Sequence, residues 1–532
     1  MGIVFQKDKR SGIEYAYDNV SYWDKEKKQS RSKRSLIGRV NEAGEIVPTD
    51  GRCRRDKNNL KRTRKRGPVP ITQIKRVFYG ATYLFDEIVE KIGLSNDLRV
   101  CFPSDYKAIL SMAYYLMLGE NRAMMNFNYW AREHIHPHEA DISSQESSRI
   151  LAQISEEQVR HFIELQWKRR SEDEYWAYDS TSISSYSTTL KQVKYGKNKE
   201  SDPLPQINIL LLYGEKTGLP FYYRKLSGNI PDVKTVNTLV KELDTIGKGK
   251  AKFVMDREFY SKKNIDQLFQ YHHKFIVAAS TRLSFVKKRI DELGEKIRDY
   301  EKHDPVYGLG VSSTTIEWDY AQERPYKKDI LTDKRRMYLH LYYNVQKAAD
   351  DELALNDKID KLKEELVSGN TVDSHEKMYQ RYFTIRKTRG GQTIKVNEEA
   401  IREEKLDHGY FSLISNEVKY PIIALCLYRS KDVVEKAFCN IKERLNCRRF
   451  LTSSEASLNG KLFVVFVGLI ILSYIHTKMQ KNGLYRTYTI EQVLLELDGI
   501  EGFIEPGRAP IIGEILERQR KLYNVFDVTP PQ

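Results

Sequence analysis

Apolar and polar residues follow three successive patterns along the chain. Residues 1–70 are largely polar. Apolar positions at helical spacing then run through 74–92 and 106–118, and such spacing buries one face of a helix. Ser143-Ser-Gln-Glu146 places a serine three residues before a glutamate, which is typical of a helix start. We therefore expect a mostly helical region over residues 71–170.

From Tyr175 the pattern changes to short segments rich in aromatic, β-branched and apolar residues, which favour strands. Two of them flank Gly214-Glu-Lys-Thr-Gly218, a typical hairpin turn. The predicted elements, in order, are strands 174–183, 206–213 and 219–225, helix 233–246, strand 252–256, a helix from Ser261 and strand 274–279. This order of three antiparallel strands followed by alternating helices and strands is expected of a ribonuclease-H-like mixed sheet with helices on both faces.

A charged stretch interrupts this order between residues 284 and 405. Helical patterns enclose the β-rich segments 312–318 and 336–343, so we expect an insertion domain here. The strand pattern resumes at 410–415, and helices follow at about 430–446 and 457–478. The predicted fold is α/β, with a basic arm (1–70), a helical domain (71–170), one catalytic domain in two parts (171–283 and 406–480), the β-rich and helical insertion (284–405) and a C-terminal helical region (481–532).

Positive charge is concentrated near the N-terminus. The chain of 532 residues carries a formal charge of +15, and residues 1–70 hold 19 Lys/Arg against 9 Asp/Glu. Tyr15, Tyr17, Tyr22 and Trp23 are interleaved with polar residues in the same stretch. Cations and flat rings suit the phosphates and bases of DNA. We therefore expect a DNA-contacting arm, whose densest basic cluster is Lys61, Arg62, Arg64, Lys65 and Arg66; the alternative is a solvated charged tail.

Neither a membrane span nor a disulfide framework is expected. The longest apolar run, Leu462–Ile475, has 14 residues, which suits a buried core helix better than a membrane span. The five cysteines form no CxxC pair and are odd in number, as in a reduced, cytoplasmic protein. The cluster His134-Ile-His136-Pro-His138 could suggest a metal site, but Pro137 breaks its spacing, so a polar surface loop is the preferred interpretation.

Two aspartates lie in apolar or aromatic strand segments, where an unpaired carboxylate is costly to bury. Asp179 lies within Tyr175-Trp-Ala-Tyr-Asp-Ser-Thr181, and Asp256 ends Phe253-Val-Met-Asp256. Either one alone could be a strand-end aspartate that accepts backbone hydrogen bonds. Together, on strands expected to be neighbours, they suit a pair of metal ligands, because phosphoryl transfer uses clustered oxygen ligands for Mg²⁺.

A third carboxylate, Glu435, lies on the predicted helix 430–446. Glu435 shares one helical face with Tyr428, Lys431, Phe438 and Lys442. A separate apolar stripe, formed by Val434, Ala437, Ile441 and Leu445, can seat the helix on the sheet. The alternative is a plain amphipathic helix with ion pairs between successive turns.

These residues bring out a family resemblance. Tyr428, Lys431, Glu435 and Lys442 resemble the Y-x-x-R-x-x-x-E-x-x-x-x-x-x-K signature of DDE insertion-sequence transposases, which are related to bacterial cut-and-paste elements. Further short matches, in the family's order, are Tyr178-Asp-Ser-Thr181, Ser227-Gly-Asn-Ile-Pro-Asp232, Asp256-Arg-Glu-Phe259 and Leu458-Asn-Gly-Lys-Leu-Phe463. The resemblance spans about residues 170–480.

The resemblance implies that Asp179, Asp256 and Glu435 are the catalytic, metal-binding triad, with Mg²⁺ as cofactor and Mn²⁺ as a substitute. It implies DNA contacts from Tyr428, Lys431 and Lys442, and we add Arg257 and Arg429 as neighbouring cations. The helical domain 71–170 is expected to bind DNA as well. In relatives an aromatic residue of the insertion supports a flipped base during hairpin formation, and Trp318 is the candidate here.

Two positions depart from the family pattern. Lys431 replaces the signature arginine, which removes a bidentate fork for phosphate, and Arg429 could take over that role. Glu258 stands where relatives often have glycine. The triad is intact, so we expect an active enzyme in which Asp232 and Glu258 matter much less than the triad.

The resemblance predicts an enzyme that cuts and rejoins transposon ends and target DNA. The expected assembly is a homodimer on double-stranded DNA, without a membrane, in the cytoplasm of a bacterium and associated with the nucleoid. Two alternatives stay open: a nuclease of the same fold that does not join strands, and a domesticated DNA-binding protein with a silent active site.

Overall fold

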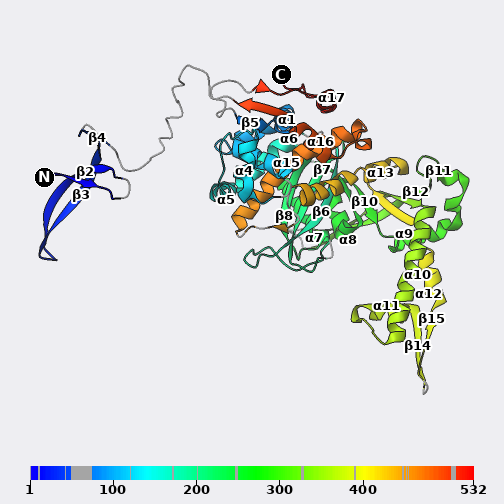
Figure 1. Cartoon of the computed structure of the whole chain (residues 1–532). Coiled ribbons are helices and arrows are strands. Elements are labelled where there is room, and N and C mark those ends of the chain that lie inside the picture. The colour runs from blue at the N-terminus through cyan, green and yellow to red at the C-terminus, as the bar shows by residue number, and fades with distance from the viewer. Residues whose placement is uncertain are drawn as a thin grey trace. The chain divides into compact units, whose positions relative to one another are not determined.

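The computed structural model describes residues 2–9, 12–41, 44–48, 75–119, 122–169, 173–199, 202–245, 250–324, 329–388, 391–445, 449–450, 452, 454–504 and 511–532. The chain separates into two compact units, residues 1–71 and 72–532. Figure 1 shows the strands of the first unit in dark blue.

The N-terminal unit is a four-stranded antiparallel sheet in the order β1-β2-β3-β4. Its strands are β1 (Gly2–Lys7), β2 (Glu14–Asp24), β3 (Gln29–Val40) and β4 (Ile46–Pro48). The polar pattern predicts a basic arm and assigns no secondary structure to it, whereas the structure has a sheet in its described part. Among the described residues of this unit only Ala16 and Gly38 are buried. Its strands therefore show almost no alternation of apolar and polar residues by which they could be predicted.

A helical layer begins the larger unit, as the apolar spacing predicts. Helix α3 has the predicted bounds, and Ser143 caps α5 by accepting a hydrogen bond from the backbone N–H of Glu146 at 3.1 Å. The helices are α1 (Gly80–Lys91), α2 (Leu94–Cys101), α3 (Tyr106–Leu118), α4 (Phe127–Glu133), α5 (Ser144–Gln153) and α6 (Glu156–Lys168).

The C-terminal region returns to this layer. Strand β5 (Lys75–Phe78), which the sequence does not predict, pairs with β18 (Glu501–Ile504). Helices α16 (Ile490–Asp498) and α17 (Glu517–Val525) lie in the C-terminal region that the sequence predicts to be helical, and β19 (Ile511–Ile512) completes the small sheet.

His134 and His136 of the histidine cluster are buried, which corrects the prediction of a polar surface loop. The ring of His134 lies 2.9 Å from the carbonyl oxygen of Trp130 and 3.2 Å from a carboxylate oxygen of Asp498. The ring of His136 lies 3.1 Å from the Ser111 hydroxyl, and burial lowers its pKa to about 4. These contacts anchor the segment after α4 to the helical layer.

A mixed sheet forms the centre of the larger unit, in the order β11-β12-β13-β16-β10-β9-β6-β7-β8, with β17 beside β6. Strands β6, β9 and β10 are parallel, whereas β7, β8 and β16 run antiparallel to their neighbours. The strands that carry or border the site are β6 (Tyr175–Ser185), β7 (Gln206–Gly214), β8 (Pro220–Ser227), β9 (Lys252–Met255), β10 (Lys274–Ala279), β16 (Tyr410–Ser415) and β17 (Arg449–Phe450).

Helices cover both faces of this sheet. The face that includes Ala177 and Val254 packs against α13 (Pro421–Arg429), α14 (Asp432–Cys439) and α15 (Glu455–Lys481). The opposite face, which includes Tyr178 and Phe253, packs against α7 (Asp232–Thr245), α8 (Lys262–Gln270) and α9 (Ser284–Leu293). The predicted mixed α/β architecture with helices on both faces is therefore confirmed.

The prediction of a separate insertion domain is wrong for its β-rich part. Strand β13 (Ile330–Tyr343) pairs with β16 and with β12 (Leu309–Glu323), which in turn pairs with β11 (His303–Asp304), so these strands extend the central sheet. Local sequence patterns do not specify which strand a segment pairs with. A projecting segment with its own small core remains, made of α10 (Val345–Ser368), α11 (Glu376–Tyr382), β14 (Phe383–Thr388), β15 (Gly391–Val396) and α12 (Glu398–Lys405) (Figure 1).

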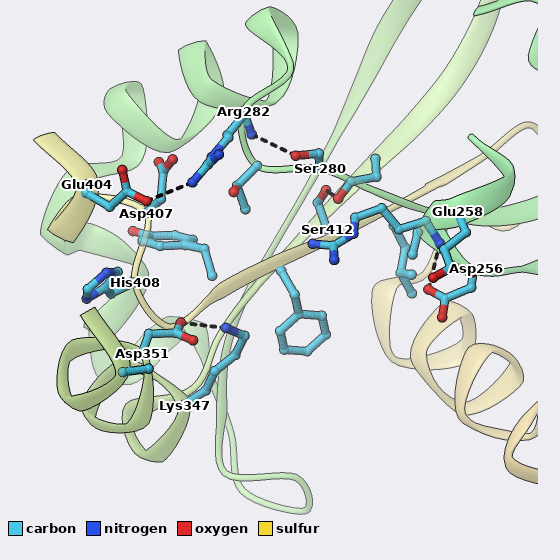
Figure 2. A pocket seen from close by; sticks show the side chains of 18 of the residues that line it. Asp256, Glu258, Ser280, Arg282, Lys347, Asp351, Glu404, Asp407, His408 and Ser412 are labelled. Carbon is cyan, nitrogen blue, oxygen red and sulfur yellow. Dashed lines mark hydrogen bonds and ion pairs between the residues drawn. The ribbon is translucent and has the colours of Figure 1, made fainter. Parts of the chain in front are cut away.

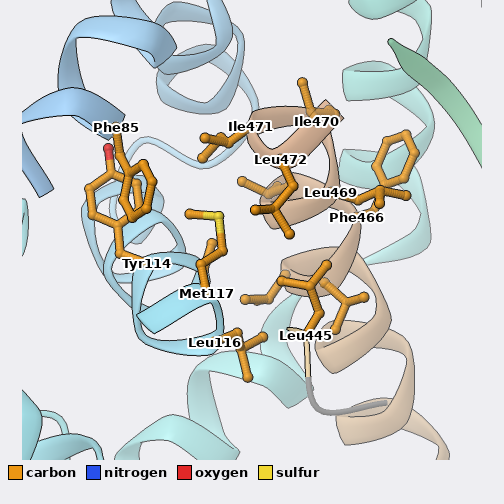
Figure 3. Packing of buried hydrophobic residues seen from close by; sticks show 14 of the residues in the cluster. Phe85, Tyr114, Leu116, Met117, Leu445, Phe466, Leu469, Ile470, Ile471 and Leu472 are labelled. Carbon is orange, nitrogen blue, oxygen red and sulfur yellow. The ribbon is translucent and has the colours of Figure 1, made fainter. Parts of the chain in front are cut away.

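Helix α15 lies in the middle of the largest apolar core. By length and composition alone it could cross a membrane, but it packs against α3, α5 and β8 and most of its residues are buried. Figure 3 shows Phe466 and Leu469–Leu472 of α15 beside Leu445 and side chains of the helical layer. This arrangement is the buried core helix that the length of the apolar run predicts.

The crossing of α5 and α15 gives a test of this packing. A Cβ at Gly460 would lie 2.0 Å from the carbonyl oxygen of Leu151, so Gly460→Ala must push the helices apart. We expect it to lower the free energy of unfolding by about 1–3 kcal/mol, measured by thermal unfolding. Gly499→Ala is the control, because its Cβ would meet nothing closer than 3.6 Å. Equal losses in both variants would contradict a tight crossing at Gly460.

Candidate active site

Two carboxylates meet at the centre of the sheet because β6 and β9 are parallel neighbours. Tyr178 pairs with Met255, so Asp179 and Asp256 occupy equivalent positions one residue further on. Side chains alternate along a strand, which turns both carboxylates toward the face covered by α13 and α14. The strand-neighbour arrangement expected from the sequence is therefore present.

Glu435 lies on α14, but not on one continuous helix. The spacing predicts a single helix over 430–446; instead α13 ends at Arg429, α14 covers Asp432–Cys439, and a π-helical turn follows at Asn440–Arg444. Tyr428, Glu435 and Lys442 thus belong to three different helical segments. The predicted apolar stripe is confirmed: its buried members, which pack α14 and the π-helical turn into the core, are Val434, Ala437, Ile441 and Leu445.

Lys431 connects the second and third carboxylates. Its Nζ lies 2.8 Å from Oε1 of Glu435 and 3.4 Å from Oδ2 of Asp256, and its side chain is only 8% exposed. Tyr428 donates a hydrogen bond to Oδ1 of Asp256 at 3.0 Å. The sequence suggests that Tyr428 and Lys431 contact DNA, whereas in this structure both contact the carboxylates.

Lys199 is a second cation at the site, and the sequence analysis does not single it out. It lies in the loop between β6 and β7, where its Nζ is 2.9 Å from Glu258, 3.4 Å from Asp232 and 3.8 Å from Asp179. The ammonium also donates to the carbonyl oxygen of Ser180 at 2.9 Å. The available signal was the group of lysines at 191, 194, 197 and 199, directly after the strand that carries Asp179.

Asp232 and Glu258 belong to the same charge cluster as Asp179. Both share Lys199 with it, and the Ser180 hydroxyl donates a hydrogen bond to Asp232. Neutralising either one would leave Lys199 with fewer partners and so alter the field at Asp179. That they matter much less than the triad stays a prediction, but the structure links both of them to Asp179 through Lys199.

The two central aspartates have opposite pKa shifts. Burial raises the pKa of Asp179 to about 6, although Lys199 and Lys431 oppose the shift. Burial would also raise the pKa of Asp256, but Lys431 and the hydrogen bonds from the Arg257 backbone and Tyr428 together hold it below its usual value. Carboxylates raise the pKa of both lysines despite their burial, so both ammonium groups stay charged.

The donor set suits a hard divalent cation. Carboxylate oxygens are the preferred ligands of Mg²⁺, and a positive charge, the Lys431 ammonium, already lies between Asp256 and Glu435. Among the described residues, however, no three His, Cys, Asp or Glu side chains are gathered closely enough to hold an ion. The three carboxylates fit a metal by their chemistry, while in this structure Lys431 lies between Asp256 and Glu435.

The other predicted DNA contacts are dispersed. The Arg429 guanidinium lies over the Tyr307 ring at 4.8 Å. Arg257 is exposed beside Asp256, and Lys442 is half-buried in the π-helical turn. The basic cluster of Lys61, Arg62, Arg64, Lys65 and Arg66 lies outside the described residues.

Trp318 is not placed to support a flipped base. Trp318 belongs to β12, and its side chain is buried in the core with 7% exposure. Its indole N–H donates a hydrogen bond to Asp266 at 2.7 Å. The Lys262 ammonium lies 5.2 Å from the ring centroid. Because β12 belongs to the central sheet, this side chain packs against α8, and the suggestion drawn from the resemblance is wrong.

A cavity of about 790 Å³ opens beside the carboxylates. Asp256, Glu258 and Tyr428 line one end, as Figure 2 shows for the two acids. The other end lies at the base of the projecting segment, where Arg282 pairs with Glu404 at 2.7 Å and Lys347 pairs with Asp351 at 2.5 Å. The cavity provides space for a substrate between the acidic cluster and that segment.

Comparison with known proteins identifies the family. The model of the family described as "Transposase DDE domain" matches residues 171–471, which include β6, β9 and α14 with their three carboxylates. No curated protein matches the sequence. Among solved structures, a cryo-EM structure of the piggyBac transposase synaptic complex with hairpin DNA is similar, with 13% identity, a TM-score of 0.32, and coverage of 83% of this chain and 70% of that one. The chain belongs to the DDE-domain transposase family and is a transposase.

The raised pKa of Asp179 predicts how stability depends on pH in the metal-free protein. Its pKa is about 6 in the folded chain against an ordinary 3.8, so the ionised carboxyl destabilises the fold above pH 6. That cost shrinks as the pH falls from about 6 toward 3.8, because the Asp179 carboxyl becomes protonated in the folded chain. Asp179→Asn should therefore stabilise the metal-free protein by about 3 kcal/mol at pH 7.5 and by less at pH 5.

Thermal unfolding in the presence of EDTA measures this difference. Asp432→Asn is the control, because Asp432 is an exposed acid on α14 paired with Lys436 at 2.7 Å. A stabilisation by Asp179→Asn that does not change between pH 5 and 7.5 would rule out a raised pKa at Asp179.

Proposed function

We propose that this transposase works by cut-and-paste: it binds the terminal inverted repeats of an insertion sequence, cleaves the DNA ends by hydrolysis and joins the 3′ ends to target DNA. One observation carries the proposal. Asp179 and Asp256 hold equivalent positions on adjacent parallel strands, and Lys431 ties Asp256 to Glu435. This arrangement occurs inside the matched transposase domain.

The sheet topology supports a ribonuclease-H-like catalytic domain. Strands β8, β7 and β6 are antiparallel neighbours, and β9 and β10 then continue in parallel to β6. Strand β9 ends beside the middle of β6, so Asp256, which follows the carboxyl end of β9, lies level with Asp179; in sheets of this kind ligands bind outside the carboxyl ends of strands.

Asp179, Asp256 and Glu435 are the proposed ligands for Mg²⁺, with Mn²⁺ able to substitute. When bound, such ions stabilise charge on the attacking and leaving oxygens of a phosphodiester. Tyr428 orients Asp256 through its hydrogen bond. Lys431 and Lys199 compensate the carboxylates in the metal-free protein, and both cations lie where a DNA phosphate would approach.

The proposed partners are the transposon ends and a target duplex, bound by a homodimer that supplies two active sites for two ends. The proposed place of action is the bacterial cytoplasm, at the nucleoid. A nuclease that cuts without joining and a catalytically silent DNA-binding protein are the alternatives. An assay that follows cut and joined products together distinguishes all three: a transposase forms both, a nuclease forms only cut product, and a silent protein forms neither.

Asp179→Asn, Asp256→Asn and Glu435→Gln test the ligand assignment. Each keeps the size of the side chain and removes one negative charge, so each should reduce Mg²⁺-dependent cleavage of the element's terminal repeats by about a hundredfold or more. Binding to the same DNA, measured by gel shift without metal, should persist.

Asp432→Asn is the matched control, since it removes an exposed carboxylate from the same helix as Glu435. It should cleave at nearly the normal rate. Normal cleavage by Glu435→Gln would exclude Glu435 as a ligand.

Lys431 gives a separate test, because its charge connects two of the proposed ligands. Lys431→Arg keeps the charge and adds a guanidinium that can donate two parallel hydrogen bonds to a phosphate. Cleavage should therefore be retained or increased. Lys431→Met leaves Asp256 and Glu435 without their shared cation and should lower cleavage clearly. The two variants are compared by single-turnover cleavage, and equal losses in both would refute a role for the charge.

A further inference from the structure

The β2–β3 hairpin extends beyond the rest of the N-terminal sheet. Strand β1 pairs with β2 only up to Asn19, and β4 pairs with β3 only from Gly38. In the described structure residues 20–33 therefore pair only with each other, from Val20–Lys33 through Tyr22–Arg31 to Asp24–Gln29, and Arg34 pairs with Asn19 at the base of this stretch. We call residues 20–34 the ribbon.

The ribbon is strongly basic and exposed. It contains six Lys/Arg and two Asp/Glu, which are Asp24 and Glu26. Asp24 accepts two backbone hydrogen bonds within the turn and lies 3.6 Å from Arg31. Lys33 and Arg34 form no ion pair among the described residues. Most of the positive charge is therefore available to a partner.

Each face of the ribbon combines cations with groups suited to DNA. Val20, Tyr22, Arg31 and Lys33 share one face, because paired residues project to the same side. The other face carries Trp23, three serines and Arg34. Tyr22 and Trp23 are 50% and 63% exposed, and neither face packs on a core. An isolated two-stranded hairpin is marginally stable in water, so a partner that covers it would stabilise it.

We propose that the ribbon enters the major groove of duplex DNA. The major groove admits a two-stranded β-ribbon, and the charge of the ribbon complements the phosphates on either side. Arginine, lysine and serine side chains on two faces can then reach phosphates and base edges together. The proposal rests on the proposed function in one respect: DNA is the substrate of the enzyme.

Trp23 provides a direct probe of this contact. The other four tryptophans, Trp130, Trp167, Trp176 and Trp318, are buried, so acrylamide quenching of the full-length protein reports mainly on Trp23. A 30-base-pair duplex of mixed sequence, added without divalent metal, should protect the fluorescence. Trp23→Phe should abolish the protected component.

A matched pair of double variants tests the charge. Lys33→Ala with Arg34→Ala removes two cations from the ribbon, whereas Lys7→Ala with Arg39→Ala removes two exposed cations from the same sheet outside it. The ribbon variant should bind the duplex about tenfold more weakly or worse, with a salt slope reduced by about two. The control should lose less than about half of that slope.

The proposal would be overturned by equal losses in both variants, by absence of protection by the duplex, or by tighter protection by single-stranded DNA or by phosphatidylserine vesicles. Netropsin, which fills the minor groove, should leave binding to an A·T-containing duplex intact, and displacement by it would exclude the major groove. These binding experiments contain no divalent metal and do not depend on cleavage. The ribbon proposal can therefore be tested even if the cleavage predictions fail.

Discussion

The parallel pairing of β6 with β9 is the constraint on which the site depends. It places Asp179 and Asp256 at the same level on one face of the sheet, although the two residues are far apart in the sequence. The apolar stripe of α14 then places Glu435 over the same point, since Val434 and Ala437 are buried against the sheet. The carboxylates are brought together by apolar packing and backbone pairing, against their own mutual repulsion.

That repulsion explains the two lysines at the site. A carboxylate cluster under a helix would be unstable without counter-charge, and here Lys431 and Lys199 each contact more than one acid. Because these contacts are distributed unequally, the pKa values of the two aspartates shift in opposite directions. Asp256, which contacts Lys431 and Tyr428, is held ionised, whereas the more deeply buried Asp179 retains a raised pKa.

The sequence predicts the elements of the central sheet well, because their apolar spacing reflects burial directly. Strands β6 to β10 and helices α7, α8 and α15 lie close to their predicted positions. It also identifies the residues that β6 and β9 bring together. It does not reveal the N-terminal sheet, which has almost no buried side chains, or the pairing of β13 with β16, which is a long-range choice.

Parts of the site escape prediction for the same reason. Lys199 reaches Asp179 from a loop whose course depends on tertiary packing, so its spacing carries no periodic signal. The π-helical turn at 440–444 changes the phase of the helix without disturbing the apolar stripe, and a face drawn from regular α-helical spacing therefore misplaces Lys442. Trp318 was misassigned because its strand joins the central sheet.

The route of the chain between β13 and β16 makes the projecting segment resemble an interchangeable cassette. Tyr343 and Tyr410 are paired across the two strands, and the backbone N–H of Asn344 donates to the carbonyl oxygen of Gly409 at 2.9 Å. The segment thus leaves and re-enters the sheet at adjacent points, as the loop of a hairpin does, and has its own apolar core. Segments of different size or shape could be exchanged at this junction without altering the register of the strands that hold the carboxylates.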